Sequence, residues 1–439
     1  MTEYRLVGDG RSDNSEALQA LLDLKGKLTL LKGVYLTGPL TVHSDTEIEF
    51  EEGAVLKFIP DFGLYKPVHT RWEGVKCWCM HPCLYIDGAK NVHIHGKGVI
   101  DGSGQAWWDQ ANARRNSTDG PQSDIEKAFA ALNPGFESQP GGGGGRQVQF
   151  LRPPLVQVHE CEDVVIEDVR LQSSPFWTLH PVFSTRLTIR GLTIENPADA
   201  PNTDGIDIES STYVTVEDCF VHVGDDGIAM KSGSGRSGIE DAAPTSHVTI
   251  RNCTVKAAHG GAVIGSETAA GIDNIEVVDC TFDGTDRGIR IKTRRGRGGA
   301  LRDLVFRNLT MRNNLCPLVV NMFYRCGCDD MSCFSLDEQP VTDETPSLCN
   351  LTVEGCHGYD NRSSAGMIVG LPESRVRNVT VRDCTFTIAK EGLEPVDRSD
   401  MYLGLPEISN RGLRLRFVED LKLENVQVEG ADEAVTTDI

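Results

Sequence analysis

The chain has 439 residues, and its 64 acidic against 43 basic side chains give a formal net charge of −21. A field of this sign repels nucleic acid and anionic membranes, so neither is predicted as a partner. Hydrophobic residues make up 39% of the chain and 45 residues are glycine, which excludes a mostly disordered protein and indicates a fold rich in turns.

The sequence predicts a cytoplasmic protein. Its first residues, 1–5, lack the basic-then-apolar pattern of a signal peptide. Its apolar runs are all well short of the roughly 20 residues needed to span a membrane. A secreted protein whose signal peptide had been removed would show the same pattern.

Residues 1–45 are predicted to form an N-terminal cap region. Residues 8–13 indicate a turn, and residues 14–22 follow as a capped start and a short amphipathic helix. Such a helix can cover the hydrophobic end that a stack of repeats leaves open.

Residues 104–147 interrupt the pattern of short strands and end in the run Gly141–Gly145, which is too flexible for a strand. This insertion is predicted to be a mobile loop on the surface, either merely tolerated or functional.

From Asp163 onward one pattern recurs, a short β-branched run with alternating polarity followed by a turn signal. The copies start at Val164, Leu187, Val214, Val248, Ile275, Leu304, Leu351, Val379 and Leu421. Many short strands without helical patterns between them predict an all-β fold, a right-handed parallel β-helix (a solenoid) that forms one catalytic domain over residues 1–439.

Aligning the copies places five of the 14 cysteines at one repeat position, where other copies carry Val or Leu. These five are Cys219, Cys253, Cys280, Cys356 and Cys384, and they are predicted to form an internal stack of small buried side chains. Two tighter groups, Cys77/Cys79/Cys83 and Cys326/Cys328/Cys333, leave zinc and disulfides open as alternatives. Their spacing lacks the paired C-x-x-C of a structural zinc site, so no metal and no cofactor are predicted.

Four segments carry the chemistry: residues 202–207, 224–227, 258–261 and 290–292. Asp204 lies 21 residues before Asp225, Asp226 lies 33 before His259, and His259 lies 31 before Arg290. Because these intervals resemble the repeat, each segment is predicted to lie on its own coil, with neighbouring coils about 4.8 Å apart.

Asp204, Asp225 and Asp226 are the candidate catalytic carboxylates. Asp-Gly pairs also form turns, and for a single aspartate that interpretation is as good. Three carboxylates on neighbouring coils would instead crowd, which raises the pKa of at least one and gives an acid beside ionised bases. That is the requirement for cleaving a glycosidic bond.

His259, next in the series, can tune the acid or bind a sugar hydroxyl. Arg290 and Lys292 are two apart on a strand and therefore point to the same face, where two cations can hold a uronate carboxylate. They belong to a basic run that also contains Arg287, Arg294, Arg295 and Arg297. We interpret this run as an anion-recognition site rather than as a solvated loop.

In this order the four segments resemble the signature of glycoside hydrolase family 28, the polygalacturonases and related pectin hydrolases. Residues 8–22 and 35–40 resemble that family as well, so the resemblance extends over most of the chain. It implies a right-handed parallel β-helix and a glycoside hydrolase that cleaves plant cell-wall pectin.

By motif, the resemblance implies that Asp225 is the general acid, that Asp204 and Asp226 activate water, and that His259 supports the acid. Arg290 and Lys292 would bind the galacturonate carboxylate, and Asn202 and Tyr324 are further substrate-binding candidates. The partner is then a galacturonate-containing oligosaccharide or polysaccharide; the oligomeric state is left open.

The leading hypothesis is inverting hydrolysis of α-1,4-linked galacturonate. The insertion 104–147 and residues 70–74 could close one end of the cleft, which favours exo action. The alternatives are rhamnogalacturonan or xylogalacturonan cleavage, a calcium-dependent pectate lyase, and a non-catalytic carbohydrate-binding β-helix.

Overall fold

Parallel strand pairs between successive coils make up most of the structure, a computed structural model that describes residues 5–115, 117–140, 143–328, 330–398 and 401–437. The chain divides into two compact units, residues 1–225 and 226–439. In each unit the coils contribute to three parallel ladders. The assignment of residues 1–439 to one domain stays a prediction.

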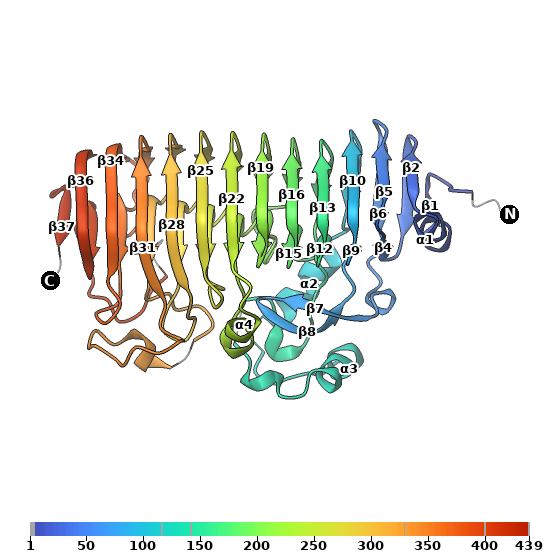
Figure 1. Ribbon diagram of the computed structural model, residues 1–439, viewed down its shortest axis with the longest axis horizontal. Coiled ribbons are helices and arrows are strands. Elements are labelled where there is room, and N and C mark those ends of the chain that lie inside the picture. The colour runs from blue at the N-terminus through green and yellow to red at the C-terminus, as the bar shows by residue number, and fades with distance from the viewer. Residues whose placement is uncertain (1–4, 116, 141–142, 329, 399–400, 438–439) are drawn as a thin grey trace. The chain divides into compact units, whose positions relative to one another are not determined.

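In the first unit each ladder stacks one strand per coil (Figure 1). The site ladder consists of β4 (Leu40–Val42), β9 (Leu84–Asp87), β12 (Val156–His159), β15 (Leu179–Val182) and β18 (Ile206–Glu209). The outer ladder consists of β2 (Gly26–Leu30), β5 (Thr46–Phe50), β10 (Lys90–Gly96), β13 (Glu162–Glu167), β16 (Thr185–Arg190) and β19 (Thr212–Glu217). The short ladder consists of β1 (Asp9–Asp13), β3 (Gly33–Thr37), β6 (Ala54–Phe58), β11 (Val99–Asp101), β14 (Arg170–Gln172), β17 (Thr193–Glu195) and β20 (Phe220–His222).

The second unit repeats the three ladders. Its site ladder is β21 (Asp226–Lys231), β24 (Gly260–Gly265), β27 (Arg287–Lys292), β30 (Cys316–Asn321), β33 (Gly366–Val369), β35 (Leu413–Arg416) and β37 (Val435–Thr437). Its outer ladder is β22 (Thr245–Arg251), β25 (Ile272–Val278), β28 (Ala300–Arg307), β31 (Ser347–Glu354), β34 (Val376–Ile388) and β36 (Val418–Glu429). Its short ladder is β23 (Thr254–Lys256), β26 (Thr281–Asp283), β29 (Thr310–Arg312) and β32 (His357–Asn361), which pairs with the end of β34.

The observed register matches the alignment of the sequence copies. In the first unit Val164 pairs with Leu187, and Leu187 with Val214. In the second unit the row runs through Val248, Ile275, Leu304, Leu351, Val379 and Leu421. The inward-facing side chains of this row are buried at every coil but the last, where Leu421 is half-buried, so a slip of one residue would expose almost the whole row.

The turn signal after each copy is a residue with left-handed backbone geometry. Asp168, Gly191 and Asp218 have φ of 60°, 63° and 56° in the first unit. Asn252, Asp279, Asn308, Gly355, Asp383 and Asn425 have φ between 52° and 60° in the second. Asn, Asp and Gly tolerate this conformation best, which explains why the corners are marked by these residues.

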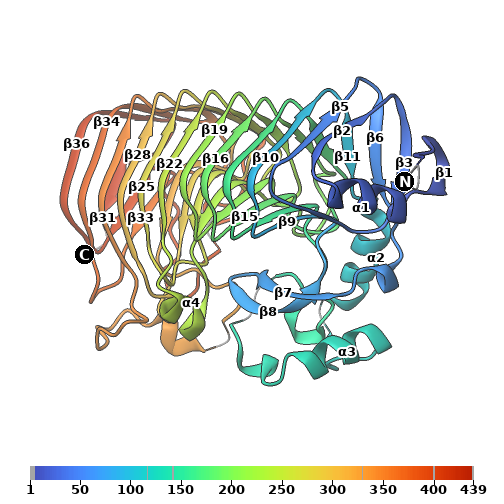
Figure 2. The same cartoon turned by 45° about the vertical axis from the view of Figure 1, so that its right-hand side comes forward.

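The predicted capping helix is confirmed as α1 (Ser15–Asp23), which buries Leu18 and Leu22. Figure 2 shows it at the start of the first unit, where it contacts β2, β3 and β4. Asp9–Asp13 forms the irregular strand β1, which pairs with β3. The predicted turn is present within it, where Asp9 Oδ1 accepts from the N–H groups of Arg11 and Ser12 and Gly10 has φ of 71°. The turn residues there are alternately exposed and half-buried, as suits an edge strand.

The sequence predicted that the insertion is a loop. This prediction is wrong, because the insertion contains two helices, α2 (Gln105–Arg114) and α3 (Asp124–Leu132). Ser123 and Glu126 form a capping box at the start of α3. The glycine run hid this signal; of that run, Gly141 and Gly142 lie outside the described residues. Asn133, at the end of α3, bonds both backbone groups of Trp78 in the hairpin β7 (Pro67–Trp72) and β8 (Val75–Met80).

The interior contains the five predicted stacked cysteines, all of which are buried. The group Cys77/Cys79/Cys83 is buried as well, whereas Cys326/Cys328/Cys333 is half-buried, and all 14 cysteines are free thiols. Among the described residues, no helix is both long and apolar enough to cross a membrane.

Candidate active site

In the first unit two predicted carboxylates come together at one edge of the site ladder. Asp204 precedes β18 and Asp225 follows β20, so the two arrive from successive coils. A carboxylate oxygen of Asp204 lies within 4.8 Å of one of Asp225. Asp204 is buried and Asp225 half-buried, so one faces protein and the other is open to a substrate.

The loop before Asp204 is fixed by hydrogen bonds to the next coil. Thr203 Oγ1 donates to the carbonyl of Ala200 and accepts from the N–H of Gly224 at 3.2 Å. A Cβ on Gly224 would lie 2.4 Å from the Ala200 carbonyl oxygen, so only glycine allows this approach. The glycine that precedes Asp225 is thereby the residue that lets the two carboxylates meet.

Arg152 lies fully buried beside these carboxylates. Its guanidinium donates to Asn202 Oδ1 at 2.8 Å and to the carbonyls of Pro175 and Pro201, both at 2.9 Å. Burial lowers the pKa of Arg152 to about 10, against the attraction of nearby acidic groups that include Asp204 and Asp225. It therefore stays charged at neutral pH.

An aromatic wall adjoins this arginine. Trp72 stacks on Phe176 with ring centroids 4.9 Å apart, and Phe176 stacks on Trp177 at 5.2 Å. A Cβ on Gly144 would approach Trp72 and Phe176 to 2.8 Å, so the end of the insertion closes against these rings. The structure thus brings the end of the insertion and residues 70–74 together, whereas the closing of a cleft by these segments stays a prediction.

In the second unit Asp226 receives the two predicted cations. Arg290 Nη1 and Lys292 Nζ each donate to one of its carboxylate oxygens at 2.6 Å. All three side chains are buried. The prediction that Arg290 and Lys292 share a face is confirmed, since both reach the same carboxylate from β27.

The sequence predicted that crowding raises the pKa of at least one carboxyl and leaves ionised bases beside it, and Asp226 is of the ionised kind. Burial by itself would raise the pKa of Asp226, but Lys292, Arg290 and Lys231 outweigh it and hold that pKa well below its usual range. Asp226 is therefore ionised at neutral pH.

Tyr324 lies over the same cations. Its ring centroid is 5.6 Å from the Arg290 guanidinium and 5.3 Å from Lys292 Nζ, distances typical of cation–π contacts. Arg290 Nη2 also contacts Met401 Sδ at 3.4 Å. The structure thus places this substrate-binding candidate with Arg290 and Lys292.

A second buried ion cluster supports Lys292. Glu267 lies 3.4 Å from Lys231 and 3.8 Å from Arg297, measured between charged atoms. Burial raises the pKa of Glu267, and Lys231, Arg297 and Lys292 together lower it to about 2. Sequence reasoning missed Lys231 and Glu267, although Lys231 ends the strand that begins with Asp226 and Glu267 lies two residues beyond the strand that follows His259.

The interpretation of the whole basic run as an anion-recognition site is too broad. Arg295 forms a two-pronged pair with Glu373 at 2.6 and 2.7 Å, and Arg294 donates to two backbone carbonyls. Arg297 donates to Ser234. These three side chains hold loops together, because their donors are directed at protein groups.

His259 stands at the start of β24 and is half-buried. Gly260, the residue after it, pairs with Asp226 on one coil and with Arg287 on the next. Arg287 Nη1 donates to the His259 carbonyl at 3.4 Å. Beside Arg287 opens a hollow of about 590 Å³, whose lining includes Leu315 and Arg398.

Arg152 was missed for a different reason from Lys231 and Glu267. It lies in the non-repetitive segment between the insertion and β12, where no periodic signal aligns it with the carboxylates. The glycine run before it marks the end of the insertion but does not indicate which residue Arg152 contacts. Its proximity to Asp204 is a product of tertiary folding.

Fold and site together define a class, the parallel β-helix proteins that carry acidic residues on one strand ladder. Residues 143–335 match the model of the glycosyl hydrolases family 28. A probable polygalacturonase from Vitis vinifera is 30% identical over 327 residues, which cover 71% of this chain and 60% of that protein. This chain spans less than two thirds of the length of the first curated relatives it matches.

Solved structures agree with this class. The chain is similar to a hyperthermoactive exopolygalacturonase from Thermotoga maritima, with a TM-score of 0.79, 28% identity, and coverage of 98% of this chain and 91% of that one. A family 28 exopolygalacturonase from Yersinia enterocolitica shares the fold, with a TM-score of 0.72, 18% identity, and coverage of 99% and 75%. The chain resembles glycoside hydrolase family 28 over residues 143–335, and the predicted right-handed parallel β-helix is confirmed.

Proposed function

We propose that this protein hydrolyses α-1,4-galacturonosyl linkages of pectic chains and acts from a chain end. The observation that carries the proposal is that two consecutive aspartates, Asp225 and Asp226, differ in their burial and in their contacts. Asp225 is half-buried beside Asp204, whereas Asp226 is buried and held ionised by Arg290 and Lys292. An acid that is open to substrate and a base that stays ionised are the requirement of glycoside hydrolysis.

In the proposed reaction Asp225 protonates the leaving glycosidic oxygen. Asp204 and Asp226 activate the water that attacks the anomeric carbon, and His259 supports the acid. Arg290 and Lys292 bind the carboxylate of the galacturonate on the leaving-group side, where Tyr324 supplies a flat surface. Both cations already donate to Asp226, and in this proposal their further N–H groups and positive charge favour a uronate over a neutral sugar.

Exo action is supported by the wall in the first unit. Gly144 is in close contact with Trp72 and Phe176, and a Cβ on Gly143 would lie 2.9 Å from Asn202 Nδ2. Backbone this close to Asn202 leaves little room for a chain to continue past it. The Thermotoga maritima protein, 28% identical to this one, is named as an exopolygalacturonase.

Inversion rests on the family resemblance. Inverting glycosidases typically separate their two carboxyl groups by about 6.5–9.5 Å, and retaining ones by about 5–5.5 Å. Here the nearest oxygens of Asp204 and Asp225 are within 4.8 Å, which by distance alone resembles a retaining pair. The stereochemistry of the product therefore has to be measured directly.

The test is to incubate the protein with trigalacturonate and to follow products by chromatography and the newly formed anomer by NMR. Release of monogalacturonate with the β-anomer formed first supports the proposal in full. The α-anomer formed first would contradict inversion, and a rapid loss of polymer viscosity before monomer or dimer is released would contradict exo action. An unsaturated product that absorbs in the ultraviolet and disappears with chelator would identify a lyase instead.

A further inference from the structure

We infer that Arg152 is a positioning residue of the catalytic site, which clamps the loop that carries Asn202 and Asp204 and supplies the fixed positive charge beside Asp204 and Asp225. This inference rests on the proposed function, because it assigns Arg152 a role in the same reaction. None of the four sequence segments contains Arg152, and it does not contact substrate in this assignment.

The clamp consists of three hydrogen bonds from one guanidinium. Two of them end on consecutive residues, the Pro201 carbonyl at 2.9 Å and Asn202 Oδ1 at 2.8 Å. The third ends on the Pro175 carbonyl, in the turn before the aromatic wall. Asp204 follows two residues after Asn202, so the fork of Arg152 fixes where this carboxylate enters the site.

The clamp and the wall are one packed structure. The Arg152 guanidinium lies 5.0 Å from the Phe176 ring centroid, Phe176 stacks on Trp72, and Arg146 lies 5.1 Å from Trp72. Trp72 Nε1 donates to the Arg152 carbonyl at 2.9 Å. Arg146, in turn, belongs to the end of the insertion and donates to the Trp72 carbonyl. A shift of the wall is therefore transmitted to Asn202 through Arg152.

The charge of Arg152 has a defined set of neighbours. Glu73, Asp204 and Asp225 attract it and Arg115 repels it, and Asp226 follows Asp225 in the chain. Exposure of this arginine is only 1%, so its field on the two carboxylates is weakly screened by water. A buried cation near Asp204 favours the ionised form that its role as a base requires.

Three variants separate the hydrogen-bonding clamp from the charge. Arg152→Met removes the clamp and the charge, and Arg152→Lys keeps the charge but loses the forked hydrogen bonds. Arg146→Met disturbs the same aromatic wall but leaves Arg152, the cation near Asp204, in place. Each is measured for kcat/KM against pH on trigalacturonate. Each is also titrated by NMR with ¹³C at the aspartate carboxyls, assigned with Asp204→Asn and Asp225→Asn.

Arg152→Met is expected to lower kcat about 100-fold, since a misplacement of about 1 Å costs this much. Its carboxyl titrations and both limits of the pH profile should move up by about one pH unit, because a favourable cation is lost. Arg152→Lys should keep the wild-type titrations and still lose about tenfold in kcat. Arg146→Met should keep the wild-type titrations.

A folded Arg152→Met protein with wild-type kcat and wild-type titrations would overturn the inference. If Arg152→Met does not fold, Arg152→Lys decides, because wild-type kcat in that variant would show that the fork is not needed. If the wild-type protein releases no galacturonate, the proposed function fails, whereas the titrations of Asp204 and Asp225 in the variants still decide the role of Arg152.

Discussion

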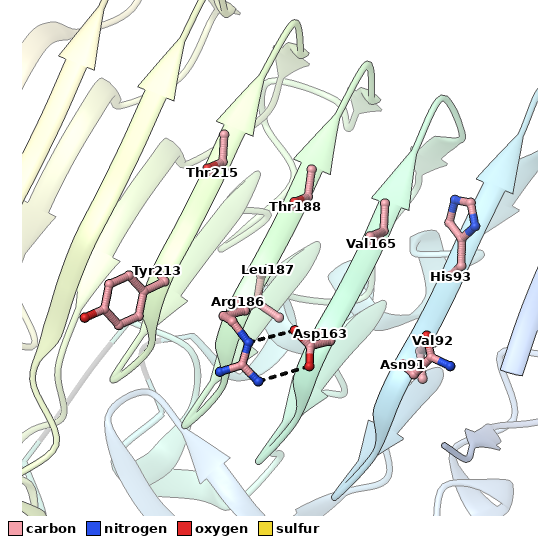
Figure 3. A pocket seen from close by; sticks show the side chains of 10 residues that line it. All are labelled: Asn91, Val92, His93, Asp163, Val165, Arg186, Leu187, Thr188, Tyr213 and Thr215. Atoms are coloured by element: carbon pink, nitrogen blue, oxygen red, sulfur yellow. Dashed lines mark hydrogen bonds and ion pairs between the residues drawn. The ribbon is translucent and has the colours of Figure 1, made fainter. Parts of the chain in front are cut away.

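Two regions of this molecule use the same chemistry with opposite consequences. On the outer ladder of the first unit, Arg186 bonds both carboxylate oxygens of Asp163 at 2.7 and 3.0 Å (Figure 3). In the second unit, Arg290 and Lys292 bond both oxygens of Asp226 at 2.6 Å. The outer side chains are about half exposed, at 48% and 54%, whereas Asp226 is 1% exposed.

The two carboxylates are paired in a similar way but differ in their exposure to solvent. The outer pair borders a shallow hollow of about 460 Å³ that also contains His93 and Tyr213, and water screens its charges. Such exposed pairs contribute little to stability. The buried carboxylate has no water to replace its cations, so its ionisation and its orientation both depend on them.

The largest expected effect concerns the proposed acid. Asp225→Asn should lower kcat by about 10³-fold with a nearly unchanged KM, because a proton donor is lost while the substrate-binding cations remain. Product release from trigalacturonate gives kcat, and calorimetry with the variant gives binding. Asp163→Asn on the outer ladder is the control and should keep wild-type kcat. Wild-type turnover of Asp225→Asn would contradict its role as acid.

Asp226→Asn tests the buried side of the comparison by its effect on stability. Removing one partner of a buried pair leaves Arg290 and Lys292 uncompensated, so the free energy of unfolding should fall by about 3–5 kcal/mol. Urea unfolding at neutral pH measures this, with Asp163→Asn again as the exposed control. Equal changes in the two variants would mean that burial does not distinguish the regions.

Glu267 sharpens the comparison through pH. Its pKa is lowered from 4.5 to about 2, so its contribution is complete above about pH 4.5 and is lost as the pH falls toward 2. The stability difference between wild type and Glu267→Gln should be about 3 kcal/mol at neutral pH and should shrink below pH 4.5. Urea unfolding from pH 3 to 7 measures it. A difference that instead grows on acidification would contradict the pairing with Lys231 and Arg297.

The smallest effect is expected at the exposed pair. Arg186→Gln removes a cation that bridges Asp163 and Glu162, yet the urea midpoint and kcat/KM should stay within experimental error of the wild type. The matched buried variant is Arg290→Gln, which should raise KM for trigalacturonate about tenfold or more through loss of a charge-assisted bond. A destabilised Arg186→Gln protein would show that the outer charges matter more than their exposure indicates.

Much of the fold could be predicted because a β-helix repeats itself along the chain. Aligning copies from Val164 to Leu421 gave the observed register, and the corner residues Asp168 and Asn252 have the expected left-handed geometry. The helices α2 and α3 were missed because their signals are local, whereas the glycine run at the end of the insertion dominates its composition.

The sequence by itself determined the features that are periodic: which residues face the core, that Asp204 and Asp225 come from successive coils of the first unit, and that Asp226, His259 and Arg290 do so in the second. Only the tertiary structure decided how the charges are shared. Arg290 and Lys292 lie on Asp226, Arg295 lies on Glu373, and Arg152 reaches Asn202 across 50 residues of chain. The physical reason is that a repeat encodes spacing along the coil axis, whereas pairing and burial depend on side-chain packing, which no linear interval specifies.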